Sequence, residues 1–369
     1  MTKTQTIMNK KQIFWWRTCF GDQEAESFRK AIANENISEG ALTRQLEEKI
    51  AQSLEVPYAV MTTSGSTALL LGIMALDIGP GDEVILPNRT WIATAHAVLM
   101  AGASVRLVDV RSDVPVMDVS RIEEKINSKT KAILPVHLNG RAVDMQKVQA
   151  IADKHGLHVI EDAAQSLYSK NSGTYLGTES NVGCFSMGIS KLISTGQGGF
   201  VVTKDKKTYE KIKSIKNHGI TDIFTDTWGQ RGFNFKFTDL LSSVGLAQMR
   251  VVEGRINHLK ELYKRYSEGI KGLPFLKIVP VNLAGGEFPI YVEAMCPSRD
   301  RFQAFLASRG VQIRPVPPNI SISNYLNNEG EFPHSEVFSQ QGLYLPCGPG
   351  QSFENVDVVV NTLHEFKDY

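Results

Sequence analysis

The stretch YAVMTTSGSTALLLGIMAL (58–76) contains the pattern that decides the fold. Residues 58–62 predict a short strand, and the residues from Thr67 to Leu76 predict a helix. The turn SGST (64–67) joins the two. A strand that leads directly into a helix is the unit from which α/β proteins are built, so this stretch predicts the α/β class.

The alternation of strand and helix continues along the chain. Further strands are expected at 82–87, 104–110, 132–138, 157–162, 183–187 and 198–203. The segments expected to be helical are 90–101, 118–127 and 144–154. Strands separated by helices give a mainly parallel sheet that is covered on both faces.

The C-terminal third has a different order of elements. A long helical stretch is expected from about residue 240 to 273, with Gly254 and Gly269 as the only strong candidates for a break. A smaller α+β segment follows, with a strand, a helix and a strand at PIYVEAM (289–295), RDRFQAFLASRG (299–310) and VQIRPV (311–316).

The length of 369 residues suggests two domains, at about 150 residues per domain. We expect a large domain over 36–250 and a small α+β domain over 251–369. The first residues, 1–35, are expected to form an arm that wraps or caps the large domain.

Composition excludes several classes of protein. Lys and Arg (40) nearly balance Asp and Glu (39), so no overall field attracts nucleic acid or an anionic membrane. No apolar run reaches the about 20 residues that a spanning helix needs, and we read no signal peptide at the start of the chain. The four cysteines lack metal-ligand spacing. We expect a cytoplasmic protein without a metal site.

The turn SGST is a candidate anion site. Gly65, Ser66 and Thr67 lie at the start of a helix, where free backbone N–H groups, hydroxyls and the helix dipole favour a phosphate. The alternative is that Ser66 only caps the helix.

A second candidate is VIEDAAQS (159–166), which places Asp162 at the carboxyl end of a buried strand. Ligands of open α/β sheets bind at that edge. The carboxylate could bind a metal, a ribose or a protonated pyridine nitrogen, or it could cap the next helix. Glu161 and Asp162 are adjacent, so they should point apart and only one should enter a site.

The third candidate is CFSMGISKLISTGQGG (184–199), in which Lys191 is the only charged residue. Apolar and small neighbours reduce the solvation of its amine, which frees the amine for Schiff-base chemistry. Ser186 and Ser190 could donate hydroxyls to a phosphate. The alternative is an ordinary surface lysine.

The three candidates, in this order, match the contacts that pyridoxal-phosphate (PLP) chemistry requires: a phosphate turn, an acid and a lysine. A dinucleotide-binding dehydrogenase would instead carry GxGxxG after its first strand, and SGSTALL lacks that pattern.

From about Phe20 to Phe366 the sequence resembles the DegT/DnrJ/EryC1/StrS family of sugar aminotransferases. The motifs that carry the resemblance are ISEGALTRQLEEKIA (37–51), SGSTALL (64–70), GPGDEVILPNRTWIATAHAVLMAGA (79–103), AILPVHLNGRAVDM (132–145), VIEDAAQS, CFSMGISKLISTGQGGFVVT (184–203) and GFNFKFTDLLSSVGLAQM (232–249). The resemblance implies an aspartate-aminotransferase-like (type I PLP) fold, with a mainly parallel seven-stranded sheet in the large domain and a small α+β C-terminal domain.

The resemblance also implies roles around the ring of the cofactor. Lys191 would carry PLP and move the proton between substrate and cofactor, and Asp162 would pair with the pyridinium nitrogen. Gln165 would bind the phenolic oxygen. Trp91 would stack on the ring, with a tryptophan of the core as the alternative.

Around the phosphate, the resemblance implies a cradle of Gly65, Ser66, Thr67 and Ser186. Asn234 matches a residue that reaches the phosphate from the neighbouring subunit, which implies a homodimer with shared active sites.

Three departures from the family pattern stand out. Ser64 replaces an Asn, Phe235-Lys236 replaces a Tyr-Arg pair, and MGISK (187–191) replaces a more aromatic run. None removes a group that transamination needs.

Lys191 also separates two enzyme classes. Relatives that act as 3-dehydratases carry histidine at this position, so the lysine favours an aminotransferase, with L-glutamate as the expected amino donor. A non-catalytic, regulatory PLP-binding protein is the alternative class, but it would be expected to lose Lys191, Asp162 or the phosphate residues.

For the substrate, GVQIRPVPPN (310–319) resembles perosamine-synthase-like enzymes, which aminate carbon 4 of a nucleotide-linked 4-keto-6-deoxyhexose. The product would be an amino sugar for a surface polysaccharide or a secondary metabolite. Arg314 could bind a diphosphate or a donor carboxylate, or it could be a surface arginine, and His218 and Arg231 fall near the family's substrate side. Carbon-3 enzymes, other keto sugars and small phosphorylated ketones remain alternatives. FWWRTCF (14–20) matches nothing that we can assign.

Overall fold

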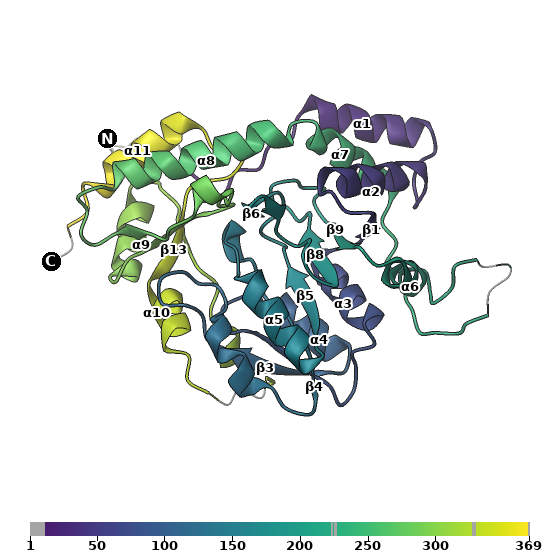
Figure 1. Ribbon diagram of the computed structural model, residues 1–369. Helices are drawn as coiled ribbons and strands as arrows, with labels where there is room; N and C mark the ends of the chain where they lie inside the picture. Colours follow the sequence, from purple (N-terminus) through teal and green to yellow (C-terminus); the bar gives the residue numbers. More distant parts are fainter. Residues whose placement is uncertain (1–11, 223, 225–226, 327–329, 368–369) are drawn as a thin grey trace, which may run out of the picture.

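The computed structural model describes residues 12–222, 224, 227–326 and 330–367. Its centre is a seven-stranded sheet with the strand order β1-β9-β8-β5-β4-β2-β3 (Figure 1). The strands are β1 (Tyr58–Thr62), β2 (Glu83–Pro87), β3 (Ser104–Val108), β4 (Thr130–Ile133), β5 (His158–Asp162), β8 (Val182–Ser186) and β9 (Gly199–Thr203). The expected seven-stranded α/β sheet is therefore confirmed.

Strand direction decides where the side chains at the strand ends meet. β9 runs antiparallel to both β1 and β8, and every other pair of neighbours in the sheet is parallel. β1 and β8 consequently point the same way as β2 and β5. The residues that follow these four strands lie along one edge of the sheet.

The two faces of the sheet bury separate groups of side chains. Val60 and Val201 belong to the core cluster formed with α3 (Gly65–Ala75), α4 (Ala93–Met100), α5 (Met145–His155) and α6 (Lys206–Lys216). Met61 and Phe200, one residue away, belong to the cluster formed with α2 (Ala41–Ser53) and the C-terminal segments. The period of two along each strand produces this division.

The C-terminal part has its own sheet. Four antiparallel strands lie in the order β10-β11-β13-β12. Their bounds are β10 (Lys277–Ile278), β11 (Val292–Met295), β12 (Arg314–Pro315) and β13 (Gly342–Leu345), and the helices of this part are α8 (Val252–Gly269), α9 (Arg299–Ser308), α10 (Pro333–Gln341) and α11 (Phe353–Leu363). A hairpin of two-residue strands, β6 (Lys170–Asn171) with β7 (Thr174–Tyr175), lies between β5 and β8 in the sequence, and the N–H of Lys170 donates to the Gly286 carbonyl.

The expected single helix over 240–273 is wrong. The structure has α7 (Asp239–Met249) and α8, with a break at Arg250 and Val251 rather than at either glycine. Gln248 and Arg255, on the two sides of this break, both donate side-chain hydrogen bonds to the carbonyl of Cys19. A contact with the N-terminal segment therefore accompanies the break, and a local pattern cannot reveal such a contact.

The expected helix over 118–127 is also wrong, because only two 3-10 turns form there, Val119–Arg121 and Glu123–Lys125. The side chains of Asp118 and Asn127 accept hydrogen bonds from backbone N–H groups two residues later. Local bonds of this kind compete with a continuous helix.

Several expected strands are shorter than predicted; the strand at 289–295, for example, covers only Val292–Met295. Within the small sheet the strand at 311–316 pairs only at Arg314 and Pro315, although Val311 forms an isolated bridge to Ile13, and the strand at 132–138 ends at Ile133. Proline lacks the backbone N–H that a ladder requires, and Pro135 and Pro317 follow closely after the paired residues.

The N-terminal segment divides into two parts. Residues 13–17 run beside the small sheet, with bridges from Ile13 to Val311 and from Trp16 to Cys347. The helix α1 (Asp22–Ala33) packs against α7 (Figure 1). The proposed boundary near residue 250 falls at the break between α7 and α8, although one core cluster runs from α2 to α11 across it.

Within the described residues, no helix is long and apolar enough to cross a membrane. Among the same described residues, no group of three His, Cys, Asp or Glu side chains is arranged so that it could hold a metal ion.

Asp239 connects α7 to α2 and provides a test of this packing. Its buried carboxylate accepts hydrogen bonds from the N–H groups of Gly40, Leu42 and Thr43 and from the Thr43 hydroxyl, at 2.7–3.1 Å. It thereby satisfies the free donors at the start of α2.

We predict that Asp239→Ala lowers the free energy of unfolding by about 3 kcal/mol, because buried donors lose their acceptor. Urea unfolding followed by circular dichroism measures this change. Asp357→Ala is the control, since Asp357 is 61% exposed in its ion pair with Arg265 and should contribute less than about 1 kcal/mol. Equal effects of the two substitutions would contradict the prediction.

Candidate functional site

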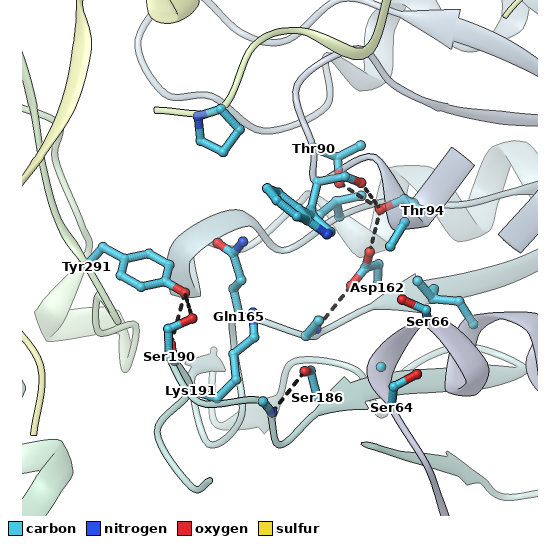
Figure 2. A pocket seen from close by; sticks show the side chains of 18 of the residues that line it. Ser64, Ser66, Thr90, Thr94, Asp162, Gln165, Ser186, Ser190, Lys191 and Tyr291 are labelled. Carbon is cyan, nitrogen blue, oxygen red and sulfur yellow. Dashed lines mark hydrogen bonds between the residues drawn. The ribbon is translucent and has the colours of Figure 1, made fainter. Parts of the chain in front are cut away.

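A pocket of about 390 Å³ opens at the edge of the sheet where β1, β2, β5 and β8 end. Figure 2 shows side chains from these strand ends directed into it. Of the predicted site residues, those that line the pocket are Gly65, Ser66, Trp91, Asp162, Gln165, Ser186, Ser190, Lys191 and Arg314. Segments more than 200 residues apart in the sequence thus supply one site.

The turn after β1 is a helix cap. Ser64, not Ser66, is the N-cap of α3: its hydroxyl accepts the N–H of Thr67, and the Thr67 hydroxyl accepts the N–H of Ser64. The helix begins at Gly65, two residues before the expected start at Thr67. Ser66 therefore does not cap the helix, and it lines the pocket. The Thr67 hydroxyl donates to the Ser64 carbonyl and so belongs to the cap.

Gly65 makes a close approach possible. A Cβ atom at this position would lie 2.8 Å from the Cβ of Ser186, at the end of β8. The turn after β1 and the end of β8 therefore meet with only hydrogen atoms between them. Backbone N–H groups at the start of α3 and the hydroxyls of Ser66 and Ser186 share one corner of the pocket.

Asp162 lines the same pocket from the carboxyl end of β5. Its carboxylate accepts hydrogen bonds from the Thr94 hydroxyl at 2.8 Å and from the Ala164 N–H at 3.1 Å, and Thr94 in turn contacts the Thr90 hydroxyl (Figure 2). Burial raises the pKa of Asp162 above its ordinary value, and the hydrogen bond from Thr94 opposes that shift. The group is thus an oriented, poorly solvated carboxylate that a cation in the pocket would stabilise.

Glu161 points the other way, as expected. It is fully buried, and it binds the His137 Nε2 atom at 2.8 Å and the N–H groups of Gly177, Glu179 and Ser180 at 2.8–2.9 Å. Although burial raises the pKa of Glu161, the hydrogen bond with His137 and those from the backbone lower it overall. Glu161 fixes the loop behind β5, and Asp162 is the carboxylate that enters the pocket.

Lys191 lies in the loop between β8 and β9, half-buried, and lines the same pocket. The backbone N–H of Lys191 donates to the Gly188 carbonyl. The neighbouring Ser190 is fixed by the Tyr291 hydroxyl, which donates to the Ser190 carbonyl at 2.9 Å. Figure 2 shows Lys191, Gln165 and Asp162 directed toward the same space. An ordinary surface lysine would lack this setting.

Two further side chains shape the pocket. The Gln165 Oε1 atom accepts the Asn139 N–H at 3.0 Å, so the group that Gln165 offers to a ligand is its NH2 donor. Trp91 is 52% exposed and lines the pocket, which excludes the alternative of a core tryptophan.

Four predicted site residues lie elsewhere among the described residues. Thr67 belongs to the cap of α3, and Asn234, His218 and Arg231 lie on the segment between α6 and α7, which projects from the body (Figure 1). Arg231 lines a different pocket. These three residues are exposed and do not contribute to the described pocket of their own chain.

The pocket also contains residues that the sequence reasoning missed. Thr94 could have been suspected, because it follows Thr90 by one helical turn directly after a strand. Trp15 and Tyr291 could not, because each comes from a segment whose place beside the pocket depends on the tertiary fold.

The pattern of strands, helices and pocket is that of a two-part α/β enzyme with its site at the carboxyl edge of the sheet. The model of the DegT/DnrJ/EryC1/StrS aminotransferase family matches residues 18–364. The chain therefore belongs to this family of aminotransferases, as its motifs predicted.

Individual relatives support the same assignment. GDP-perosamine synthase of Escherichia coli O157:H7 is 32% identical over 332 residues, which are 89% of this chain and 91% of that protein. The dTDP-3-amino-3,4,6-trideoxy-alpha-D-glucose transaminase of Streptomyces venezuelae is 32% identical over 330 residues, 87% of this chain and 86% of that protein. The crystal structure of S. venezuelae DesV matches with a TM-score of 0.89 at 28% identity, covering 97% of this chain and 100% of that one.

The raised pKa of Asp162 predicts a dependence of stability on pH. An unfolded chain releases this proton near pH 3.8, whereas the folded chain keeps it to a higher pH. Stability is therefore lost as the pH rises from the unfolded pKa through the folded pKa.

We predict that Asp162→Asn raises the melting temperature of the cofactor-free protein at pH 7, and that this gain disappears as the pH falls toward 4. Thermal unfolding at a series of pH values measures it. Asp357→Asn, on an exposed side chain, is the matched control. A variant that is less stable than the wild type at pH 7, or a gain that does not vary with pH, would show that burial of the charge is not the cause.

Proposed function

We propose that this protein transfers an amino group to a nucleotide-linked keto sugar with PLP as cofactor and L-glutamate as donor. The observation that carries the proposal is that Lys191 and Asp162 line one pocket together with the turn at the start of α3. The substrate we favour is a 4-keto-6-deoxyhexose.

The residues present fit the phosphate of PLP. The start of α3 offers N–H groups and the positive end of the helix dipole, and Ser66 and Ser186 add hydroxyls. The turn can approach Ser186 this closely only because Gly65 has no Cβ atom. We assign Gly65, Ser66 and Ser186 to the phosphate, and we assign Thr67 to holding the turn in shape.

The residues also fit the ring. Asp162 is a buried carboxylate for which a protonated pyridine nitrogen would be the missing cation, and Thr94 holds it in place. Gln165 is oriented to donate to the phenolic oxygen, and Trp91 offers an aromatic face. PLP, when bound, withdraws electrons from the substrate carbon through its protonated ring.

Lys191 would perform the proton transfers. Lys191 lines the pocket, and the hydrogen bond from Tyr291 to Ser190 anchors the neighbouring loop, so the amine would be held in place beside a bound substrate. A single amine can remove a proton at one atom and return it at another, as general base and then general acid. A non-catalytic binding protein would have no need of these groups, and all of them are present.

The relatives bear on the sugar. GDP-perosamine synthases are among them, and the resemblance of residues 310–319 to perosamine-synthase-like enzymes supports amination at carbon 4. The S. venezuelae relative is named for a 3-amino sugar, which supports carbon 3 as the second candidate. The product would be an amino sugar made in the cytoplasm for a surface polysaccharide or a secondary metabolite.

We also propose a homodimer with shared active sites. Asn234 is exposed and outside the described pocket of its own chain, and so are His218 and Arg231. Trp228 and Phe233 on the same segment are 76% and 69% exposed, a large apolar area for a single chain. A second copy would cover these side chains and receive Asn234 in its phosphate corner.

We predict that borohydride reduction fixes the cofactor to the peptide that contains Lys191, and that Lys191→Ala abolishes this adduct, because the amine is the atom that forms the bond. Mass spectrometry of the digested protein measures it. Lys204→Ala, on an exposed lysine after β9, is the control and should keep the adduct. An unchanged adduct in Lys191→Ala would overturn the assignment.

The shared site predicts rescue between two inactive chains. In a mixed dimer of Asn234→Ala and Lys191→Ala, one of the two sites receives an intact Lys191 and an intact Asn234. Co-expression with two different tags, followed by purification on both tags, yields only mixed dimers and should therefore give about half of wild-type activity, since one of their two sites is intact. Activity no higher than the mean of the two parents would argue for a site built from one chain.

A further inference from the structure

The N-terminal segment 13–17 is built into the wall of the active-site pocket. The N–H of Arg17 donates to the Cys347 carbonyl, and the N–H of Cys347 donates to the Trp15 carbonyl, both at 2.9 Å. The N–H of Trp15 donates to the side chain of Gln312, and the Gln351 amide donates to the Phe14 carbonyl. These bonds fix the backbone of the segment beside the strands of the small sheet.

This backbone places the Trp15 ring in the pocket. Trp15 lines it together with Tyr291 and Tyr344, and its ring centroid lies 6.1 and 6.3 Å from theirs. Trp16, the next residue, turns away: its indole N–H donates to the Ile189 carbonyl, and its ring does not line the pocket. Within the described residues, Trp15 is the side chain through which the N-terminal segment enters the site.

The guanidinium of Arg314 lies over the face of Trp15, with its carbon atom 4.8 Å from the ring centroid. Arg314 also lines the pocket. In the described part of the chain, no carboxylate is found within ion-pair distance of Arg314. Its charge is thus held by a contact with an aromatic face, which leaves its N–H donors available.

The charges that line the pocket indicate what Arg314 would bind. The charged side chains among the lining residues are Lys191, Asp162 and Arg314. In the proposed function Lys191 carries the cofactor and Asp162 pairs with its ring, so both are occupied. Arg314 remains as the cation that faces an incoming substrate.

We propose that Trp15 is a positioning residue that holds the Arg314 guanidinium flat at the mouth of the pocket, where Arg314 binds an anionic group of the substrate. The group is a planar or tetrahedral oxyanion: the carboxylate of the amino donor or the phosphate of the nucleotide. An exposed arginine otherwise populates many rotamers, and the stacked contact reduces what binding must order. The inference rests on the proposed function for the identity of the substrates, but the anion contact can be measured separately.

The test uses holoenzyme and two probes, 2-oxoglutarate and a nucleoside diphosphate (GDP and dTDP), with binding measured by isothermal titration calorimetry. The variants are Arg314→Ala, Trp15→Leu, Trp15→Phe, the double variant Trp15→Leu with Arg314→Ala, and Phe14→Ala. Leucine keeps the apolar packing of the segment without a π face, and phenylalanine restores that face. Phe14 is the matched control, because it is the neighbouring aromatic residue and its side chain does not line the described pocket.

We expect Arg314→Ala to weaken one of the probes by about tenfold, the size of a lost charge-assisted hydrogen bond. Trp15→Leu should weaken the same probe by about three- to fivefold, the size of a cation–π contact, and Trp15→Phe should retain most of the affinity. The double variant should bind no more weakly than Arg314→Ala alone, because Trp15 acts through Arg314. Weaker binding of 2-oxoglutarate identifies the donor carboxylate, and weaker binding of the nucleoside diphosphate identifies the phosphate.

The inference is overturned if Trp15→Leu binds both probes as the wild type does, if its loss adds to that of Arg314→Ala, or if neither probe binds the wild type. Borohydride trapping on the same samples separates this result from the proposed function. If the wild type forms no adduct at Lys191 but the variants weaken anion binding as expected, the proposed function is rejected and the Trp15–Arg314 contact is kept. If the adduct forms and the variants bind both probes as the wild type does, the contact is rejected and the function is kept.

Discussion

The burial of the Asp162 carboxylate at the end of β5 is the constraint that determines which groups surround it in the site. A carboxylate without water is costly, and the protein supplies it with the Thr94 hydroxyl and one backbone N–H, both neutral donors. Glu161, one residue earlier and buried just as deeply, receives three backbone N–H groups and His137. The contrast explains why burial raises the pKa of Asp162 while hydrogen bonds lower that of Glu161. Glu161 is satisfied by its own chain, and Asp162 is prepared for a cation from outside.

The sheet delivers the other parts of the site to the same edge. Because β9 is antiparallel to both β1 and β8, the turn after β1 and the end of β8 lie at the same edge of the sheet. They are so close that a Cβ atom at Gly65 would clash with Ser186. A side chain at this position would push the two strand ends apart. The anion corner and the carboxylate thus occupy fixed places in a rigid sheet, and the loop that bears Lys191 lies between them. Such rigidity is what orientation of a reacting group requires.

The other wall of the pocket comes from segments far away in the sequence. Tyr291, Tyr344 and Arg314 belong to the small sheet and its connections, and Trp15 comes from the N-terminal segment that runs along this sheet. The carboxyl edge of the seven-stranded sheet holds the groups that fit a cofactor, and the small sheet with its N-terminal segment lines the other side of the pocket. The same fold could therefore accept different substrates through changes in this wall, while the edge of the large sheet is kept.

The sequence by itself determined the elements whose signals are local. The strands at 58–62 and 157–162 were predicted within one residue of β1 and β5, since a buried strand flanked by a turn and a helix is recognisable in its own residues. Motif order was enough to single out Asp162 and Lys191 and to indicate the family. The tertiary structure alone decided the break at Arg250, where Gln248 and Arg255 meet the carbonyl of Cys19. It also decided the entry of Trp15 into the pocket beside Tyr291 and Tyr344. These features depend on contacts between distant segments, whose free energy appears in no local pattern of residues.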